Sequence, residues 1–197
     1  SSQSLKEDYS TKFEEMSHAL PLALFDYLIK SKNKGFVLSL SGGADSSTIA
    51  LMVRRMVSLA IDELGIVAFR NRLKLPDHLT EINQIMAQLL ITAYQGTANS
   101  SHETAESAKK LAKAIGSTHY EWHVDDQIAG YCHTIENAIG RKLNWEQDDI
   151  TLQNIQARSR SPIIWMLANI HHHLLLTTSN RSEGDVGYAT MDGDTSG

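Results

Sequence analysis

Residues 36–47 read Phe-Val-Leu-Ser-Leu-Ser-Gly-Gly-Ala-Asp-Ser-Ser, and this stretch decides the fold. Its short apolar run predicts a buried strand, and residues 45–62 continue with an apolar pattern of helical period. Between the two lie Gly42 and Gly43, which allow a sharp turn and a close approach to a ligand. Free N–H groups at the start of a helix favour an anion. The stretch therefore predicts a strand, a tight turn and a helix that together hold phosphate.

The turn carries a carboxylate, Asp45, and no lysine. It therefore differs from the mononucleotide loop Gly-x-x-x-x-Gly-Lys-Ser/Thr and from the dinucleotide pattern Gly-x-Gly-x-x-Gly. A carboxylate repels phosphate unless a cation lies between them, and Mg²⁺ is commonly bound by one or two carboxylates plus phosphate oxygens. We expect a Mg-pyrophosphate site. The alternative is a Gly/Ser turn in which Asp45 and Ser46 only cap the helix.

The composition is that of one soluble globular domain, with 197 residues, 42% hydrophobic and 21% charged. A net charge of −5 argues against a general nucleic-acid or membrane-surface binder. The single cysteine, Cys132, excludes a disulfide within the chain, and we interpret it as a core residue. No apolar run reaches the roughly 18 residues that span a bilayer, and the N-terminus shows no signal peptide. We expect a cytoplasmic protein.

Strand and helix patterns alternate along the chain. Strands are expected at 36–40, 89–94, 118–124 and 174–178. Helices are expected at 4–33 (in two pieces), 45–62 and 150–173. Two further helices are expected: one begins at a capping box of Ser100 and Glu103 and ends at 115, and the other begins at an Asp125 cap. Residues 63–80 show no clean period. This order predicts an α/β fold with a parallel sheet, whose ligands bind at the carboxyl ends of the strands. The chain ends in a loop, so we expect the domain to continue past Gly197.

The sequence Ser-Gly-Gly-x-Asp-Ser after a strand resembles the pyrophosphate loop of the N-type ATP pyrophosphatases, a group that includes NAD synthetase and GMP synthetase. Its members cleave ATP between the α and β phosphates and adenylate an oxygen of the substrate. The resemblance implies a Rossmann-like adenine nucleotide alpha hydrolase fold with helices on both faces of the sheet. It also implies that ATP is bound by Leu40, Ser41, Gly42, Gly43, Ala44, Asp45, Ser46 and Ser47.

A second motif, Asn-Ile-Gln-Ala-Arg-Ser-Arg, occupies residues 154–160. Asn154 and Arg158 lie four apart and share a helix face, where residue types alone favour a solvated surface. The motif resembles the segment of NAD synthetases that contacts nicotinic acid adenine dinucleotide from the dimer-forming helix. The resemblance implies that Asn154 and Arg158 contact the dinucleotide and that Arg160 contributes. Pro162 is expected to kink or break this helix, whose apolar face is expected to carry Ile163, Met166 and Ile170.

A third motif, Thr-Thr-Ser-Asn-Arg-Ser-Glu, follows the last predicted strand at residues 177–183. Glu183 lies beyond a strand end, from which it can approach Asp45 across the sheet edge and share Mg²⁺; alternatively it simply starts a loop or helix. The motif resembles NAD synthetases, which implies that Thr178 contacts ATP, that Glu183 binds Mg²⁺ and the dinucleotide, and that Asp194 reaches the dinucleotide. Asp45 and Glu183 would then be the catalytic pair. Met191 replaces a lysine common in ammonia-dependent members, which points to the glutamine-dependent branch.

Together the three motifs predict an NAD synthetase domain over residues 1–197. It would convert nicotinic acid adenine dinucleotide to NAD through an adenylate, using ATP, Mg²⁺ and ammonia that is free or made by a glutaminase domain upstream. The resemblance implies a homodimer or higher oligomer, with neither nucleic acid nor membrane as a partner. The alternatives are another amidotransferase of the group, such as GMP synthetase, and a non-catalytic adenine-nucleotide-binding module. The histidines at 171–173 are either zinc ligands or, as we favour, cations at a helix C-terminus.

Overall fold

The structure, a computed structural model, describes residues 23–178. Their centre is a four-stranded parallel sheet in the order β3–β2–β1–β4. The strands are β1 (Phe36–Ser39), β2 (Leu90–Gly96), β3 (Thr118–His123) and β4 (Leu174–Leu176). The chain moves outward from β1 to β3 and then returns to the other side of β1. The strand order therefore reverses between β1 and β4, where a parallel sheet opens a crevice at its carboxyl edge. The predicted parallel α/β fold is confirmed.

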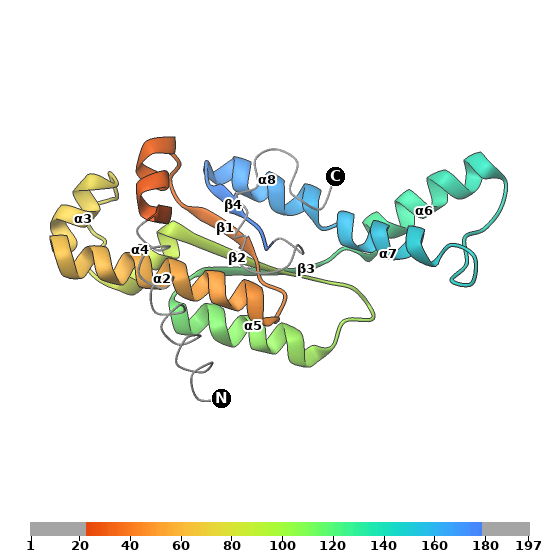
Figure 1. Ribbon diagram of the computed structural model, residues 1–197, viewed down its shortest axis with the longest axis horizontal. Coiled ribbons are helices and arrows are strands. Elements are labelled where there is room, and N and C mark those ends of the chain that lie inside the picture. Colours follow the sequence, from red (N-terminus) through yellow and green to blue (C-terminus); the bar gives the residue numbers. More distant parts are fainter. Residues whose placement is uncertain (1–22, 179–197) are drawn as a thin grey trace, which may run out of the picture.

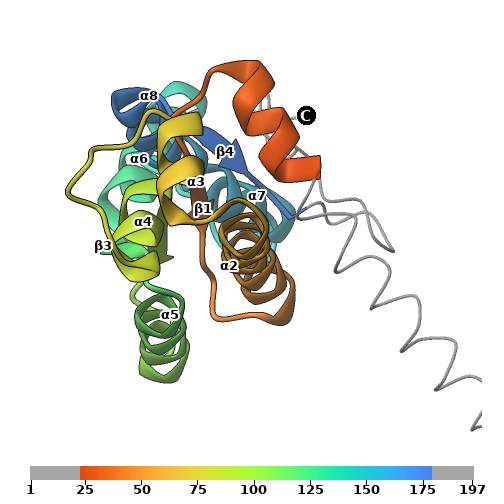
Figure 2. The same cartoon turned by 90° about the vertical axis from the view of Figure 1, so that its left-hand side faces the viewer.

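Helices connect the strands and cover both faces of the sheet (Figure 1). They are a helix over residues 23–31, α2 (Ala44–Leu64), α3 (Ile66–Arg72), α4 (Ile82–Leu89), α5 (His102–Ile115), α6 (Asp125–Ile139), α7 (Asp149–Arg158) and α8 (Ser161–His171). In the end-on view, α2 and α5 lie on one side of the strands and α8 on the other (Figure 2). The prediction of helices on both faces is confirmed.

The two faces have separate cores because successive strand residues point to opposite sides. Phe36, Leu38 and Leu40 join the larger core, which holds the buried sides of helix 23–31, α2, α4 and α5. Val37 joins the smaller core, where Ile164 and Ala168 of α8 pack on β1, β2 and β4. The carboxyl ends of β1 and β4 thus lie between α2 on one side and α8 on the other.

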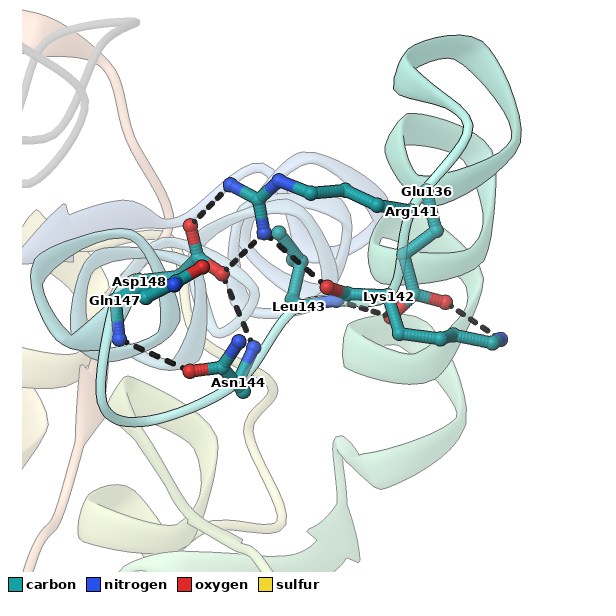
Figure 3. A network of polar contacts seen from close by, with 7 residues as sticks. All are labelled: Glu136, Arg141, Lys142, Leu143, Asn144, Gln147 and Asp148. Carbon is teal, nitrogen blue, oxygen red and sulfur yellow. Dashed lines mark hydrogen bonds and ion pairs between the residues drawn. The ribbon is translucent and has the colours of Figure 1, made fainter.

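Helices α6 and α7 form an arm, residues 125–158, that projects from one end of the body (Figure 1). Neither helix buries a single residue. A polar network holds the loop between them: Arg141 binds Asp148 through two contacts of 2.8 Å, and Glu136 binds Lys142 Nζ at 2.8 Å and the Leu143 N–H at 2.9 Å (Figure 3). The arm's loop is therefore shaped by hydrogen bonds and ion pairs rather than by a core.

Two segments differ in part from the sequence-based expectations. Residues 63–80, for which no element was predicted, contain α3. The break expected at Pro162 is confirmed, because Pro162 lies in the first turn of α8 and the stretch 150–173 forms two helices, α7 and α8. The apolar face expected on this segment is wrong, because it points away from the sheet, with Met166 and Ile170 accessible to 56% and 69%. The residues that α8 buries are Ile164 and Ala168.

The predicted helix starts were also displaced. Ser101, not Ser100, caps α5 by accepting a hydrogen bond from the Thr104 N–H at 3.2 Å. Asp125 lies in the first turn of α6 and accepts instead from the Ala98 N–H at 2.9 Å. The cap of α5 is thus one residue later than expected, whereas Asp125 satisfies a backbone donor outside α6.

The interpretations of Cys132 and of the histidine run need correction. Cys132 is half-buried on α6, a helix that has no core residues, so it is not a core cysteine. His173 is buried, and burial lowers its pKa, so it is not the helix-end cation expected there. Within residues 23–178 no group of three His, Cys, Asp or Glu side chains is arranged to hold a metal.

Candidate nucleotide site

The turn after β1 is held in shape by its own serines. The Ser41 N–H donates to Ser46 Oγ at 3.2 Å, the Gly43 N–H donates to Ser41 Oγ at 3.2 Å, and Ser47 Oγ donates to the Gly43 carbonyl at 2.7 Å. The N-cap of α2 is Gly43, and no side chain caps it. Asp45 and Ser46 are therefore not helix caps, and the N-terminal end of α2 keeps its attraction for an anion.

Gly42 lets this turn pack against α5. Its φ is +81°, and a Cβ on it would come within 2.7 Å of the Thr104 carbonyl oxygen. Thr104 is itself fixed, because its Oγ1 lies 2.8 Å from the Tyr94 hydroxyl on β2. Gly43 differs, since its φ is −86° and an added Cβ would meet only Ser41 Oγ, at 3.2 Å. The two glycines thus have separate roles, and the first fixes the turn in place against its neighbour.

A cavity of about 490 Å³ opens at the crevice between β1 and β4, which is within the range of small-molecule sites. Its lining comes from the ends of β1, β2 and β4, from the turn, and from the α7–α8 junction. The lining residues are Ser39, Ser41, Ser46, Gln95, Ala157, Arg160, Ser161, Pro162, Ile164, Trp165, Leu175, Leu176, Thr177 and Thr178.

The structure brings some of the predicted ATP residues together. Ser41, Ser46 and Thr178 line this one cavity, although Thr178 lies well over a hundred residues beyond the turn. Asp45 is exposed in the first turn of α2. Leu40 is fully buried in the larger core, and its N–H donates to the Ala93 carbonyl at 2.7 Å. A role for Leu40 in ATP binding stays a prediction.

The predicted dinucleotide residues, unlike Ser41, Ser46 and Thr178, are not found together in the cavity wall. Asn154 and Arg158 are exposed on α7 and do not line the cavity, whereas Ala157 and Arg160 of the same segment do. Glu183 and Asp194 lie outside the described residues. Of the two predicted Mg²⁺ ligands, the structure therefore describes only Asp45.

Two polar residues of the cavity wall, Ser39 and Gln95, were given no binding role from the sequence. Gln95 is 6% exposed, and its side-chain amide links Ser39 Oγ and Trp122 Nε1, each at 3.1 Å. Arg160, expected to contribute to dinucleotide binding, lines the cavity, and its Nε donates to the Gln95 carbonyl at 3.0 Å and its Nη1 to the Gln156 carbonyl at 3.0 Å. The position of Gln95 at the carboxyl end of a predicted strand was the one available signal.

This arrangement defines a parallel α/β protein with a glycine-containing turn before an uncapped helix N-terminus and a cavity at the switch point of its sheet. The NAD synthase family matches residues 16–197. A glutamine-dependent NAD(+) synthetase of Oryza sativa subsp. indica is 33% identical over 204 residues, which cover 92% of this chain and 28% of that protein. The chain belongs to the NAD synthase family.

Solved structures agree. A glutamine-dependent NAD(+) synthetase from Cytophaga hutchinsonii is 56% identical with a TM-score of 0.81, covering 91% of this chain and 33% of that one. A second, from Acinetobacter baumannii in complex with ADP, is 26% identical with a TM-score of 0.64, covering 92% and 28%. The fold is that of the adenine nucleotide alpha hydrolases. The chain spans a third or less of the length of these relatives.

Among the helices of residues 23–178, none combines the length and apolar character needed to cross a membrane.

Proposed function

We propose that this chain is the synthetase domain of a glutamine-dependent NAD synthetase, which amidates nicotinic acid adenine dinucleotide to NAD at the expense of ATP. The observation that carries the proposal is the shared cavity. Ser41 and Ser46 of the turn meet Thr178 and the α7–α8 junction there, as a site that joins a nucleotide to a second substrate requires. Membership of the NAD synthase family supports the choice of reaction.

In the first step the nicotinate carboxylate oxygen attacks the α-phosphorus of ATP, and the bond from that phosphorus to the bridging oxygen breaks. Pyrophosphate leaves, and an acyl adenylate remains. The turn contributes by binding the phosphates with its N–H groups, hydroxyls and the N-terminal end of α2. Arg160, held in the cavity wall by two backbone carbonyls, offsets negative charge. The chain accelerates this step mainly by positioning and electrostatic stabilisation.

In the second step ammonia attacks the carbonyl carbon of the adenylate, loses a proton, and displaces AMP to leave the amide. Asp45 is the described residue that would hold Mg²⁺, because its carboxylate is exposed beside the turn. Bound Mg²⁺ would offset the charge of the phosphates. Glu183 as its second ligand and Asn154, Arg158 and Asp194 as dinucleotide contacts belong to the same proposal.

The test is direct. The intact protein is incubated with ATP, MgCl₂, an ammonium salt and nicotinic acid adenine dinucleotide, and NAD, AMP and pyrophosphate are measured. We expect the three products in equal amounts. Asp45→Asn is expected to lower turnover by about 100-fold, as for loss of a group that organises transition-state charge. Turnover of xanthosine monophosphate instead would favour a GMP synthetase, and ATP binding without turnover would favour a non-catalytic module.

The nitrogen source is tested separately. We propose that the protein uses ammonia released from glutamine, because the relatives that share most of this chain are glutamine-dependent enzymes. Comparing glutamine with an ammonium salt in the same assay distinguishes the two. Activity with ammonium alone would place the glutaminase on another chain. The cytoplasmic location is likewise a proposal, to be checked by cell fractionation.

We further propose that the arm and α8 form a homodimer interface. Tyr131, Ile135 and Ile139 lie four residues apart on α6 and are 44–49% exposed, and Trp165 and Met166 are exposed on α8. An exposed row of large apolar side chains on one helix face, as on α6, is typical of an interface. Light scattering should report a dimer that Ile135→Asp dissociates. A monomeric wild-type protein would exclude this interface.

A further inference from the structure

Gln95 is a buried junction between three parts of the cavity wall. Its side chain lies on the α8 side of β2, the same side as Ile91 and Ala93, and contacts Ser39 on β1 and Trp122 on β3. Its own carbonyl accepts from Arg160 at the α7–α8 junction. One residue thus connects all three neighbouring segments through hydrogen bonds.

The chemistry of Trp122 decides which way round the Gln95 amide lies. An indole N–H can only donate, so the amide atom facing it, at 3.1 Å, must be the oxygen. The amide nitrogen then faces Ser39 Oγ at 3.1 Å. Because that nitrogen can only donate, Ser39 Oγ must accept. Amide orientation is often ambiguous, but here a donor-only partner fixes it.

It follows that the Ser39 hydroxyl cannot direct its proton to Gln95. Ser39 is half-buried and lines the cavity two residues before the phosphate-binding turn. Its hydroxyl therefore faces the site with one of its two lone pairs engaged by Gln95 and with its proton available to a ligand. An oxygen or ring nitrogen of a nucleotide is the type of atom that such a donor binds.

We propose that Ser39 is a nucleotide-binding residue that donates a hydrogen bond to ATP, and that Gln95 and Trp122 are positioning residues that fix the direction of this bond. The proposal rests on the proposed function only in naming ATP as the nucleotide. Trp122 acts through Gln95, and Gln95 acts through Ser39; neither has to touch the ligand.

The first measurement is ATP binding by calorimetry with Mg²⁺ present. Ser39→Ala should weaken binding by about three- to tenfold, the value of one net hydrogen bond. Ser31→Ala is the matched control, because Ser31 is also half-buried, but its hydroxyl lies outside the cavity, where it donates to the Leu28 carbonyl and accepts from Asn33 Nδ2. Wild-type affinity in Ser39→Ala would overturn the inference while leaving the proposed function intact. Failure of the wild-type protein to bind ATP would overturn the proposed function itself.

The decisive measurement uses Gln95→Glu. An ionised carboxylate only accepts, so it would still bind the Trp122 N–H but would also draw the Ser39 proton away from the ligand. A protonated Glu restores the original polarity, since its O–H donates to Ser39 and its carbonyl accepts from Trp122. Burial raises a carboxyl pKa, so this recovery should begin well above the ordinary value.

We therefore expect the ratio of variant to wild-type dissociation constants to be about tenfold at pH 8 and to fall toward one as the pH is lowered to 5. Wild-type protein measured in parallel cancels the titration of ATP. In the double variant Ser39→Ala/Gln95→Glu, this pH dependence should vanish. A ratio that does not change with pH, or a pH dependence that persists without the Ser39 hydroxyl, would show that Gln95 has only a structural role.

Discussion

Helix α2 and the arm are stabilised in opposite ways. The buried face of α2 includes Ile49, Val53 and Met56, which belong to the larger core against the sheet, α4 and α5. The arm buries nothing, and its loop is shaped by the Arg141–Asp148 and Glu136–Lys142 contacts (Figure 3). Burial of apolar surface is the larger stabilising effect, whereas exposed ion pairs contribute little. The turn proposed to bind phosphate is thus attached to the part of the described structure with the largest core, and the proposed dinucleotide contacts lie on the part without one.

The largest expected effect is the loss of activity caused by a substitution at Gly42, in the turn that precedes α2. Gly42→Ala would place a Cβ 2.7 Å from the Thr104 carbonyl and strain a φ of +81°, so the turn must move away from α5. We expect ATP-dependent NAD formation to fall by about 100-fold or more, because misplaced phosphate contacts act on the transition state.

Gly43→Ala is the matched control for that substitution. Its backbone is already in an ordinary extended conformation, and its Cβ would meet only a serine hydroxyl. It should retain far more activity than Gly42→Ala. Equal losses in the two variants would mean that ligand approach, and not packing on α5, requires glycine at position 42.

The second prediction compares stability. Ile49→Ala should lower the free energy of unfolding by about 2–5 kcal/mol, because Ile49 is 4% exposed in the larger core. Ile139→Ala, at a position 47% exposed on the arm, should change it by less than about 1 kcal/mol. Urea unfolding at low protein concentration, where a dimer would dissociate, measures both. Similar losses would show that the arm has a core of its own.

The third prediction concerns the arm's ion pairs. Hydrogen bonds from Arg141 and from the Asn144 N–H hold the pKa of Asp148 at about 2, below its usual 3.8. Any stability from this carboxylate is present above its usual pKa and is lost as the pH falls from about 4 toward 2. Arg141→Ala should raise the pKa of Asp148 toward 3.8, measured by NMR titration of its side chain. Lys142→Ala, which leaves the Arg141 contact in place, should leave that pKa where it is.

The smallest expected effect is on the pH dependence of stability, and it comes from His173, which precedes β4 at the amino end of the sheet. Burial lowers the pKa of His173, whose ring nitrogens face the His171 and Gln88 carbonyls at 2.9 and 3.2 Å. The unfolded chain then binds a proton more readily than the folded one. Stability should decrease as the pH falls through 6.5 and level off below the lowered pKa. His173→Gln should reduce this slope in urea unfolding between pH 5 and 8, whereas His133→Gln on the arm controls for the substitution itself.

The same contrast explains what could be predicted from the sequence. Small residues between a buried strand and an amphipathic helix specify the phosphate-binding turn locally, and the parallel sheet follows from the order of elements. The failures depend on distant contacts or on phase. Ile164 and Ala168, and not Met166 and Ile170, lie on the side of α8 that packs on the sheet, and Ser101 caps α5 while Ser100 Oγ accepts from the Thr97 N–H. A periodic pattern in the sequence shows neither which side of α8 is buried nor which serine caps α5.

In the candidate site, too, residues in local motifs could be predicted, whereas residues that depend on distant contacts could not. Ser41, Ser46 and Thr178 were predicted from short motifs and do share a cavity. Ser39 and Gln95 were not, because their importance comes from a hydrogen bond between residues 56 positions apart on neighbouring strands. A polar residue at the carboxyl end of a strand is a weak signal until the neighbouring strands are known.

The contact of Gly42 with Thr104 also bears on how quickly a nucleotide can be captured. The turn is braced by α5 and by its own serines, so its shape does not depend on the ligand. A preorganised turn loses little conformational entropy on binding, and association at this turn needs no prior rearrangement of its backbone. We therefore expect ATP to enter by simple encounter, with a single kinetic phase whose rate rises linearly with nucleotide concentration.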